Sequence, residues 1–428
     1  MIGKDYLAMA LSEATQQVKR GTKQPKRKEE ILKAAAHVMQ PKGVLATRLQ
    51  DVGEHLNVAY TALYHYFPSR DHMAEEVILW RLNARLRMLN EASGESALDR
   101  LLSFFRRELL EDQDFQVRFP PFNALPEENR KSLNRASNQL LEALSGLIDE
   151  GIREGSIRPC HSLTAANVIL GLVERFVYLD EQQTSDSVRQ LSRKELVEEM
   201  TRILEVGILS DCSHVPRASY IINKAEDLLG YDPRLNSELK RFDNMLSTAT
   251  HHFNVEGADA SIPRMAKDLG VSKTVFYQYI MDKQDLLLQC YLRGARVVEM
   301  SHRIASDFGR DPLDEMLIHR QNLYKFHDSE VGPFTLINAR YFLHPPQRRL
   351  IRLRNIAVRE ISERRMMRGI NAGTIRADVN PDIAQPMFGQ MLYSLPGWYT
   401  ETFPLDIDEV CAQTGQVIFL GLKNNLHQ

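Results

Sequence analysis

Apolar residues recur at spacings of three and four along most of the chain, which is the pattern of amphipathic helices. In the first half the pattern covers 74–89, 98–110, 137–153, 163–178 and 194–209. In the second half it covers 286–301, 313–327, 347–367, 383–395 and 407–422. No strand-like alternation persists in any segment, and prolines such as Pro386 are placed at breaks between helices. We therefore predict an all-α protein.

The second half of the chain repeats parts of the first. Leu56–Phe67 is similar to Leu269–Ile280, and Gly151–Arg158 is similar to Gly369–Arg376. The two matches occur in the same order and at nearly equal spacing. They predict that one whole unit occurs twice in tandem.

The first unit begins with the pattern of a helix-turn-helix. A helix over Lys28–Met39 is followed by one that Thr47 is placed to cap and that ends near Leu56. Asn57 suits the tight turn because it tolerates a left-handed backbone. A short helix over Ala59–Tyr66 follows, and a long helix then starts after Pro68.

The second unit shows the same pattern. Ser261 is placed to cap a helix with Pro263 in its first turn, where a missing N–H does no harm. Gly270 supplies the turn, and Ser272 is placed to cap the next short helix. A short helix held by a crossing partner fits the DNA major groove.

The helical phase predicts which side chains of the short helices point outward. In the first, Ala62, Leu63 and Tyr66 are predicted to face the core. Tyr64 and Tyr277 lie opposite the apolar stripe, which favours DNA contact over core packing. Tyr66 and its counterpart Tyr279 are interpreted as core aromatics.

Length and charge fit this interpretation. The chain has 428 residues, enough for two or three domains, and a net charge of −2. Basic residues nevertheless gather between Lys19 and Arg48, against only Glu29 and Glu30. A local basic stretch can bind a polyanion, so Lys19–Lys28 is interpreted as a DNA-reaching arm rather than an ordinary solvated face.

Other site types find little support in the sequence. Four scattered cysteines form no C-x-x-C pair, and His251, His252 and His344 lack partners at metal-ligand spacing. No phosphate-binding glycine loop or nucleophile elbow is found, so we expect neither an enzyme nor a cofactor. No apolar run is long enough to span a bilayer, and no signal-peptide stretch is seen, so we expect a cytoplasmic protein without membrane contact.

The run Leu63–Asp71, with Val58 before it, resembles the recognition-helix signature of the TetR (tetracycline-repressor-like) family, and Gly270–Tyr277 with Lys283 is similar again. The turn at Gly155–Pro159 also resembles the one before the last two helices of that family. The resemblance implies DNA-binding helices, a larger ligand-binding and dimerising domain, and repression that a small molecule relieves. The DNA contacts that it implies are Thr47, Arg48, Tyr60, Thr61, Tyr64, His65 and Arg70 in the first unit, and Ser261, Lys273, Thr274, Tyr277, Gln278 and Lys283 in the second.

The sequence departs from the family pattern at several positions. Gly53 replaces the usual alanine, and Asn57 replaces the usual turn glycine. In the second unit, Gln278 and Ile280 replace the usual histidine and phenylalanine. These two changes predict a weaker hold on phosphate in the second unit than in the first.

Aromatic residues cluster in the middle of each half. Core packing alone would explain them, while the family resemblance implies that some line an effector pocket between helices. The candidate pocket residues are Trp80, Phe104, Phe105, Phe119, Tyr324, Phe334, Tyr341 and Phe342. A separate pair, Glu174 and Arg175, is read either as a buried ion pair or as the rim of a helix interface.

These patterns predict six segments. They are an extension helix (1–24), a first helix-turn-helix domain (25–73), a first helical regulatory domain (74–212), a linker (213–234), a second helix-turn-helix domain (235–286) and a second regulatory domain (287–428). The expected partners are a double-stranded DNA operator and an unidentified small-molecule effector. The two halves are expected to pair within one chain as a pseudo-dimer, or two chains to pair as a homodimer. Each helix-turn-helix domain is called a head. The competing hypothesis is a ligand-binding or scaffolding relative whose heads no longer hold DNA.

Overall fold

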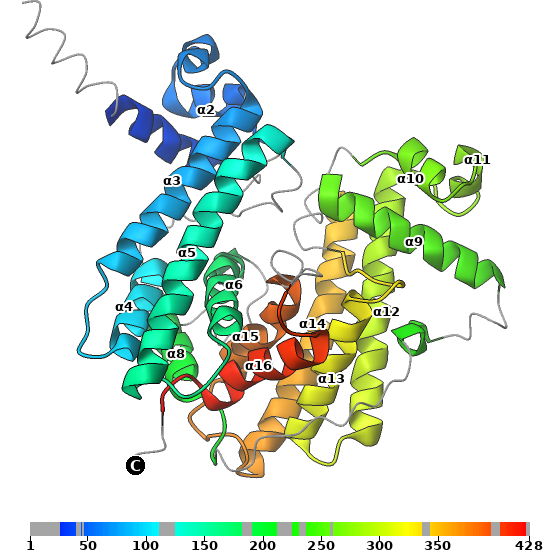
Figure 1. Cartoon of the computed structure of the whole chain (residues 1–428). Coiled ribbons are helices and arrows are strands. Elements are labelled where there is room, and N and C mark those ends of the chain that lie inside the picture. The colour runs from blue at the N-terminus through cyan, green and yellow to red at the C-terminus, as the bar shows by residue number, and fades with distance from the viewer. Residues whose placement is uncertain are drawn as a thin grey trace, which may run out of the picture. The chain divides into compact units, whose positions relative to one another are not determined.

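The computed structural model describes residues 26–39, 44, 47–110, 125–181, 191–211, 225–230, 237–256, 260–335, 343–394 and 403–424 (Figure 1). The chain divides into two compact units, named unit 1 and unit 2, whose bounds differ from those of the two repeated halves of the sequence. Unit 1 comprises Met1–Ala84 with Asp112–Ala136, and unit 2 comprises Arg85–Glu111 with Ser137–Gln428. The predicted extension helix and most of the predicted linker lie outside the described residues.

Unit 1 contains a helix over 26–39, α2 (Leu49–Leu56), a short 3₁₀ segment η2 (Tyr60–His65), and the beginnings of α3 (Arg70–Asn90) and α5 (Glu127–Glu154). Its apolar stripes meet in a core where Ile31, Val52, Leu63 and Phe67 are all at most 1% exposed. Asn57 adopts the left-handed backbone expected of it, with φ 52°. The turn between α2 and η2 is therefore formed as predicted.

Unit 2 is also helical throughout its described part. The helices of the first half of the chain are α4 (Ala97–Leu110), α6 (Ser162–Glu181) and α8 (Arg193–Val206). Those of the second half are η6 (Ala225–Leu229), α9 (Ser237–Glu256), α10 (Ile262–Asp268), α11 (Lys273–Phe276), α12 (Lys283–Phe308), α13 (Pro312–His327), α14 (Pro345–Asn371), α15 (Pro381–Ser394) and α16 (Ile407–Leu420). The described residues hold two isolated β-bridges and no strand, so the all-α prediction is confirmed.

Two helix predictions need correction. Helix α5 begins at Glu127 rather than near Ser137. Pro386 lies inside α15, within the predicted helical range 383–395, and so does not mark a break between helices. A proline inside a helix costs one main-chain hydrogen bond, and here Ile383 and Met387, each 1% exposed, hold the helix against its neighbours. Apolar packing therefore outweighs the preference of proline for positions outside helix interiors.

Four helices from the two halves of the chain pack together in unit 2. Helix α6 contacts α15 and α16, and α8 contacts the same two helices. In Figure 1, α6, α15 and α16 accordingly lie side by side at the centre. The last helices of the first half, α6 and α8, thus pack against the last helices of the second half, α15 and α16.

The contacts at the edge of this four-helix group are reciprocal. Arg158 donates its main-chain N–H to the carbonyl of Leu422 at 2.9 Å, and Arg376 donates its own to the carbonyl of Ile208 at 2.9 Å. The Arg158 side chain donates to the carbonyl of Gly421, and the Arg376 side chain donates to the carbonyl of Gly207. Corresponding residues of the two halves thus make corresponding contacts.

Candidate functional site

The short segment η2 presents a polar surface on unit 1. Tyr60 and Tyr64 are 42% and 48% exposed and pack edge to face, with ring centroids 6.2 Å apart. Thr61 and His65 beside them are exposed as well, as is Arg48 at the N-terminus of α2. Leu63 and Phe67 anchor the segment from below, since both are buried. The arrangement offers hydroxyl and imidazole groups on a firmly held support.

Four details of this region differ from the sequence-based expectations. Thr47 is fully buried and does not present its side chain, and Arg48, not Thr47, is the N-cap of α2. Ala62 is exposed, and Tyr66 is only half-buried. A 3₁₀ segment turns every three residues rather than every 3.6, which shifts its inward face. Phe67 takes the core place assigned to Tyr66.

Gly53 explains how closely η2 packs on α2. A Cβ built on Gly53 would lie 3.0 Å from the carbonyl oxygen of Val58 and 3.1 Å from the Cα of Tyr60. In the second half the corresponding Ala266 is accommodated, 3% exposed. Glycine therefore lets the first short segment approach its supporting helix more closely than the usual alanine would.

The second head, α10 with α11, presents a comparable surface on unit 2. Lys273, Thr274, Tyr277 and Gln278 are all exposed, and the Lys273 ammonium lies 5.6 Å from the centre of the Tyr277 ring. Gly270 supplies the turn with φ +66°. Phe276 is fully buried in a core built by α9, α10 and α12. The predicted outward residues of this head are therefore exposed.

The remaining predicted contact residues are less open. Ser261 is the N-cap of α10 but is half-buried, and its side chain makes no capping hydrogen bond. Ser272 is likewise the N-cap of α11 without a side-chain bond. Lys283 donates from Nζ to the carbonyl of Ala260 at 3.1 Å, and Arg70 is paired with Asp71 at 2.8 Å. These two cations lie at the edges of their heads and are already engaged.

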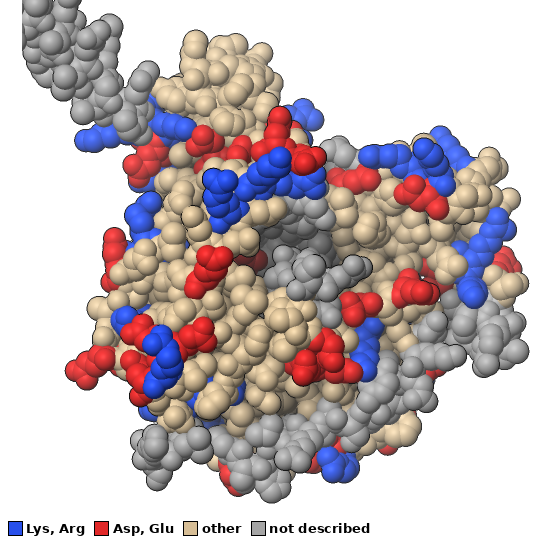
Figure 2. All heavy atoms as spheres, viewed as in Figure 1, with Lys and Arg blue, Asp and Glu red and all other residues tan. Residues whose placement is uncertain are grey.

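On the face drawn in Figure 2, the surface over the α2 end of unit 1 is mainly uncharged, whereas Lys and Arg side chains, with Asp and Glu side chains near them, lie over α10 of unit 2. In the described part of the predicted arm, Lys26–Lys28, ion pairs engage Arg27 and Lys28. Arg27 contacts Glu30 at 2.8 Å and Lys28 contacts Glu76 at 3.0 Å. The rest of the arm lies outside the described residues.

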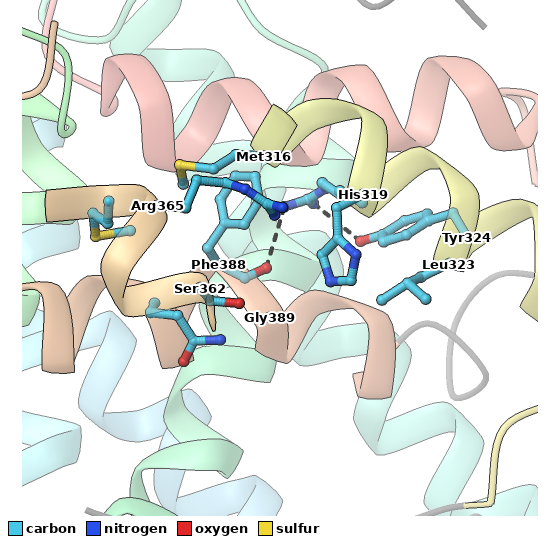
Figure 3. Close-up of a pocket in the computed structure, with 11 residues that line it drawn as sticks. Met316, His319, Leu323, Tyr324, Ser362, Arg365, Phe388 and Gly389 are labelled. Atoms are coloured by element: carbon cyan, nitrogen blue, oxygen red, sulfur yellow. Dashed lines mark hydrogen bonds between the residues drawn. The ribbon is translucent and has the colours of Figure 1, made fainter. Parts of the chain in front are cut away.

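A cavity of about 50 Å³ lies between α13, α14 and α15 of unit 2 (Figure 3). Of the predicted pocket residues, Tyr324 lines it. The others are placed elsewhere: Phe104 and Phe105 are buried in the α4 core, Trp80 is half-buried, and Phe334 packs on Phe326 with centroids 4.9 Å apart. Phe119, Tyr341 and Phe342 lie outside the described residues.

Sequence reasoning missed the polar groups of this cavity. Arg320 is 3% exposed and donates to the hydroxyl of Tyr324 at 3.0 Å, to the carbonyl of Phe388 at 3.3 Å and to the hydroxyl of Thr414. Its guanidinium also lies 4.8 Å from the centre of the Phe388 ring. The available signal in the sequence was the run of polar residues His319–Asn322 in the middle of a predicted helix.

A stacked histidine pair borders the cavity. The rings of His302 and His319 are 3.7 Å apart, and Arg365 donates to Nδ1 of His302 at 3.1 Å, which requires that imidazole nitrogen to be unprotonated. Burial, with the nearby charge of Arg365, lowers the pKa of His302 to about 3. Burial also holds the pKa of His319 well below its usual value, and electrostatic interactions with His302 and Arg365 add to the effect. Both rings are neutral in the folded protein near pH 7.

The histidine pair predicts acid destabilisation. In the unfolded chain each ring titrates near ~6.5, so below that pH the unfolded state binds more protons than the folded state. The free energy of unfolding should therefore fall as the pH drops from about 6.5 towards the folded-state value of His302. Urea unfolding of the His302→Gln variant should show a shallower pH dependence between pH 7.5 and 5 than the unaltered protein. Equal slopes, with exposed His251→Gln as the control, would contradict this.

Within the described residues no group of three or more His, Cys, Asp or Glu side chains is placed to hold a metal ion. His252 instead contacts Glu256 and Asp268 at 2.9 and 2.8 Å. Of the helices that the structure describes, none combines the length and the hydropathy needed to span a bilayer. Glu174 lies 3.7 Å from Arg85, while the side chain of Arg175 lies outside the described set.

The chain is similar to known bacterial regulators. Residues 31–77 match the model for bacterial regulatory proteins of the tetR family, and residues 94–178 match that for the tetracyclin repressor-like C-terminal domain. Nucleoid occlusion factor SlmA of Vibrio vulnificus is 30% identical over 177 residues, covering 37% of this chain and 88% of SlmA. The HTH-type transcriptional repressor KstR2 of Mycolicibacterium smegmatis is 25% identical over 168 residues, covering 35% and 74%.

Among solved structures, the regulator PfmR of Thermus thermophilus aligns with 41% of this chain and 92% of its own, at 22% identity and a TM-score of 0.33. The relative at 30% identity, the nucleoid occlusion factor SlmA, is covered over 88% of its length. The first helix-turn-helix and the helices after it are the parts that the family models match. With an all-helical fold and a helix-turn-helix of the expected form, this chain belongs to the TetR family of DNA-binding transcriptional regulators.

Proposed function

We propose that this protein is a ligand-responsive repressor that reads an asymmetric operator through two unequal heads on one chain. The observation that carries the proposal is the exposure of polar side chains on both short segments, Tyr60–His65 and Lys273–Gln278. Hydroxyl, imidazole and ammonium groups at such positions suit base edges and phosphate oxygens. The first head is a tyrosine-rich surface with Arg48 exposed beside it, and the second carries a lysine near a tyrosine ring.

The proposal includes pairing of the two halves within one chain. A two-fold interface is self-complementary, so that if residue i contacts j, the second copy of j contacts the second copy of i. The bridges Ile157–Lys423 and Leu209–Ile375 follow this rule for corresponding segments of the two halves. The packing of α6 and α8 on α15 and α16 supports the same arrangement. One chain would then supply what two chains supply in a homodimer.

Unequal heads have a direct consequence for the operator. A two-fold dimer reads a palindrome because its heads are identical. Here the exposed residues Tyr60, Thr61 and His65 correspond to Lys273, Thr274 and Gln278. The two half-sites should therefore differ in sequence.

Selection of bound fragments from random DNA, at a stated salt concentration, tests this proposal. The expected product is a site with two unlike halves. Thr61→Ala with Tyr64→Ala should weaken binding to one half about 10- to 100-fold, and Thr274→Ala with Tyr277→Ala should do the same to the other. Ser237→Ala, at the exposed start of α9, is the control that should change neither half. A perfect palindrome that needs both heads of one chain would overturn the proposal.

Light scattering distinguishes pairing within a chain from pairing between chains. The proposal predicts the mass of a single chain, 49.1 kDa, in the absence of DNA. Twice that mass would indicate a homodimer with four heads instead. Failure to select any DNA at low salt would favour a relative whose heads no longer hold DNA.

A further inference from the structure

The N-terminal half of helix α14 presents apolar side chains to solvent. Leu350 and Leu353 are 46% and 56% exposed, and Ala357 is exposed as well. Positions three and four residues apart lie on one face of a helix, so these three side chains form one stripe, called the leucine stripe. Ile351, on the opposite face of α14, is buried in the core that also holds Phe276 of the second head. The leucine stripe therefore faces away from that core.

Helix α5 of the first half is the counterpart of α14. The repeated glycine turns that follow the two helices align them without a gap, and the helices then begin at matching residues, Glu127 and Pro345. The same alignment places Leu133 over Ile351. Both of these side chains are buried, at 0% and 5% exposed. Matching positions of the two helices can therefore be compared directly.

The fold does not require leucine in the stripe. In this alignment Leu350 and Leu353 correspond to Ser132 and Arg135 of the first half. Helix α5 thus forms with a polar residue at both places. Single exposed apolar residues are common on protein surfaces and need no explanation. Two neighbouring ones that only one of two related helices carries are better explained by a partner than by the fold.

Arginines surround the leucine stripe. Residues 345–359 contain five arginines and no acidic residue, whereas the matching residues 127–141 contain three basic and two acidic ones. Arg348 and Arg349 are exposed, and Arg352 is half-buried. None of these three side chains forms an ion pair with the part of the chain that the structure describes. Positive charge that the described chain does not neutralise therefore borders the stripe.

Apolar and basic groups together narrow the choice of partner. Arg349 lies one helical turn before Leu353, so a partner that touches one also touches the other. DNA phosphates would pair with the arginines but leave the leucines without an apolar surface to cover them. A second copy of the chain would bring two arginine-rich helices together, which like charges oppose. An anionic bilayer binds in proportion to the apolar area that it buries, and this stripe is only about 10 Å long.

We propose that this face of α14 is a docking site for an acidic amphipathic segment of another protein. The apolar side chains of the segment cover Leu350 and Leu353, and its carboxylates pair with Arg349 and Arg352. A helix laid along α14, with apolar residues at spacings of three and four, meets both requirements. A helix of about two to three turns is long enough to cover the stripe. The inference goes beyond the proposed function and does not depend on DNA binding.

Selection from a display library of random peptides on the full chain tests the proposal. The selected peptides should be acidic, with Leu, Ile or Phe at spacings of three and four residues. One such peptide, synthesised and labelled, should bind in fluorescence anisotropy, and less tightly as salt rises, because salt screens exposed charges. Leu350→Ser with Leu353→Arg, which installs the first-half residues, should weaken its binding about 10-fold or more. Phe308→Ser, at another exposed apolar residue of unit 2, is the matched control that should bind as before.

A second double variant covers the case in which the first fails to fold. Arg349→Gln with Arg352→Gln leaves the leucine stripe intact, and it should weaken peptide binding about 10-fold and flatten the salt dependence. Arg303→Gln, at an exposed arginine of α12, is its control and should change neither quantity.

Three results would overturn the proposal. The first is selection of neutral or basic peptides only, and the second is unchanged peptide binding by either double variant. The third is the absence of any selected peptide while DNA duplexes or phosphatidylglycerol vesicles bind through the same residues. Since the operator is selected in a separate experiment, the docking proposal and the proposed function can fail independently.

Discussion

Replacing Asp243 with alanine should lower the free energy of unfolding by about 3–5 kcal/mol. Asp243 on α9 accepts two hydrogen bonds from Arg293 on α12, at 2.8 and 2.7 Å. Both side chains are buried, and the Arg293 guanidinium also lies 5.2 Å from the centre of the Phe326 ring. Without the carboxylate, Arg293 would remain charged in a water-excluded place.

The effect should reach the second head. Helices α9 and α12 form the core that supports α10 and α11, with Leu246, Phe276 and Leu286 buried between them. We therefore expect Asp243→Ala to weaken binding to the second half-site while leaving the first unchanged. Urea unfolding measures the stability, and the selected DNA site measures the head.

Two controls separate the loss of the ion pair from a general effect of substitution. Glu360→Ala removes the partner of Arg364 from an exposed pair and should cost no more than about 1 kcal/mol. The double variant Asp243→Leu with Arg293→Met removes both charges and should recover most of the lost stability. A double variant less stable than Asp243→Ala would show that the ion pair itself, rather than the uncompensated arginine, sets the cost.

Most helices were predictable because an apolar stripe repeats with the helical period. Helix α13 begins at Pro312 and ends at His327, within one residue of the prediction. Boundaries failed where packing decides: α5 extends to Glu127, and α15 continues through Pro386. Periodicity reports which face of a helix is apolar but not which other face covers it.

The candidate sites were predictable to different degrees. Exposure of Tyr64 and Tyr277 followed from their phase against the buried Leu63 and Phe276. The burial of Thr47 could not be predicted from the helical phase. A shift of one residue at a helix cap changes which side chain faces inward. The buried hydrogen bonds of Arg320 could not be foreseen either. Their acceptors, the carbonyl of Phe388 and the hydroxyl of Thr414, lie on helices far along the chain.

Gly421→Ala should disrupt the reciprocal contact between the two halves and lower the free energy of unfolding by about 2–5 kcal/mol. Gly421 has φ +68°, and a Cβ there would overlap the backbone of Glu205 and Gly207. Gly207, with φ +73°, would meet Phe419 and Gly421 in the same way. Two glycine backbones thus approach each other where the segments after α8 and α16 meet, and neither position has room for a side chain.

The control for this prediction is Gly373→Ala. Gly373 has nearly the same backbone conformation, φ +73°, but a Cβ there would meet no atom within 4 Å. It should therefore cost only the left-handed strain, about 1–2 kcal/mol. If pairing of the halves depends on this contact, Gly421→Ala should also expose the apolar faces of α6 and α15, and light scattering should show the mass rising with protein concentration. Equal losses for the two variants, with the mass of one chain throughout, would mean that the close approach of the glycines does not hold the halves together.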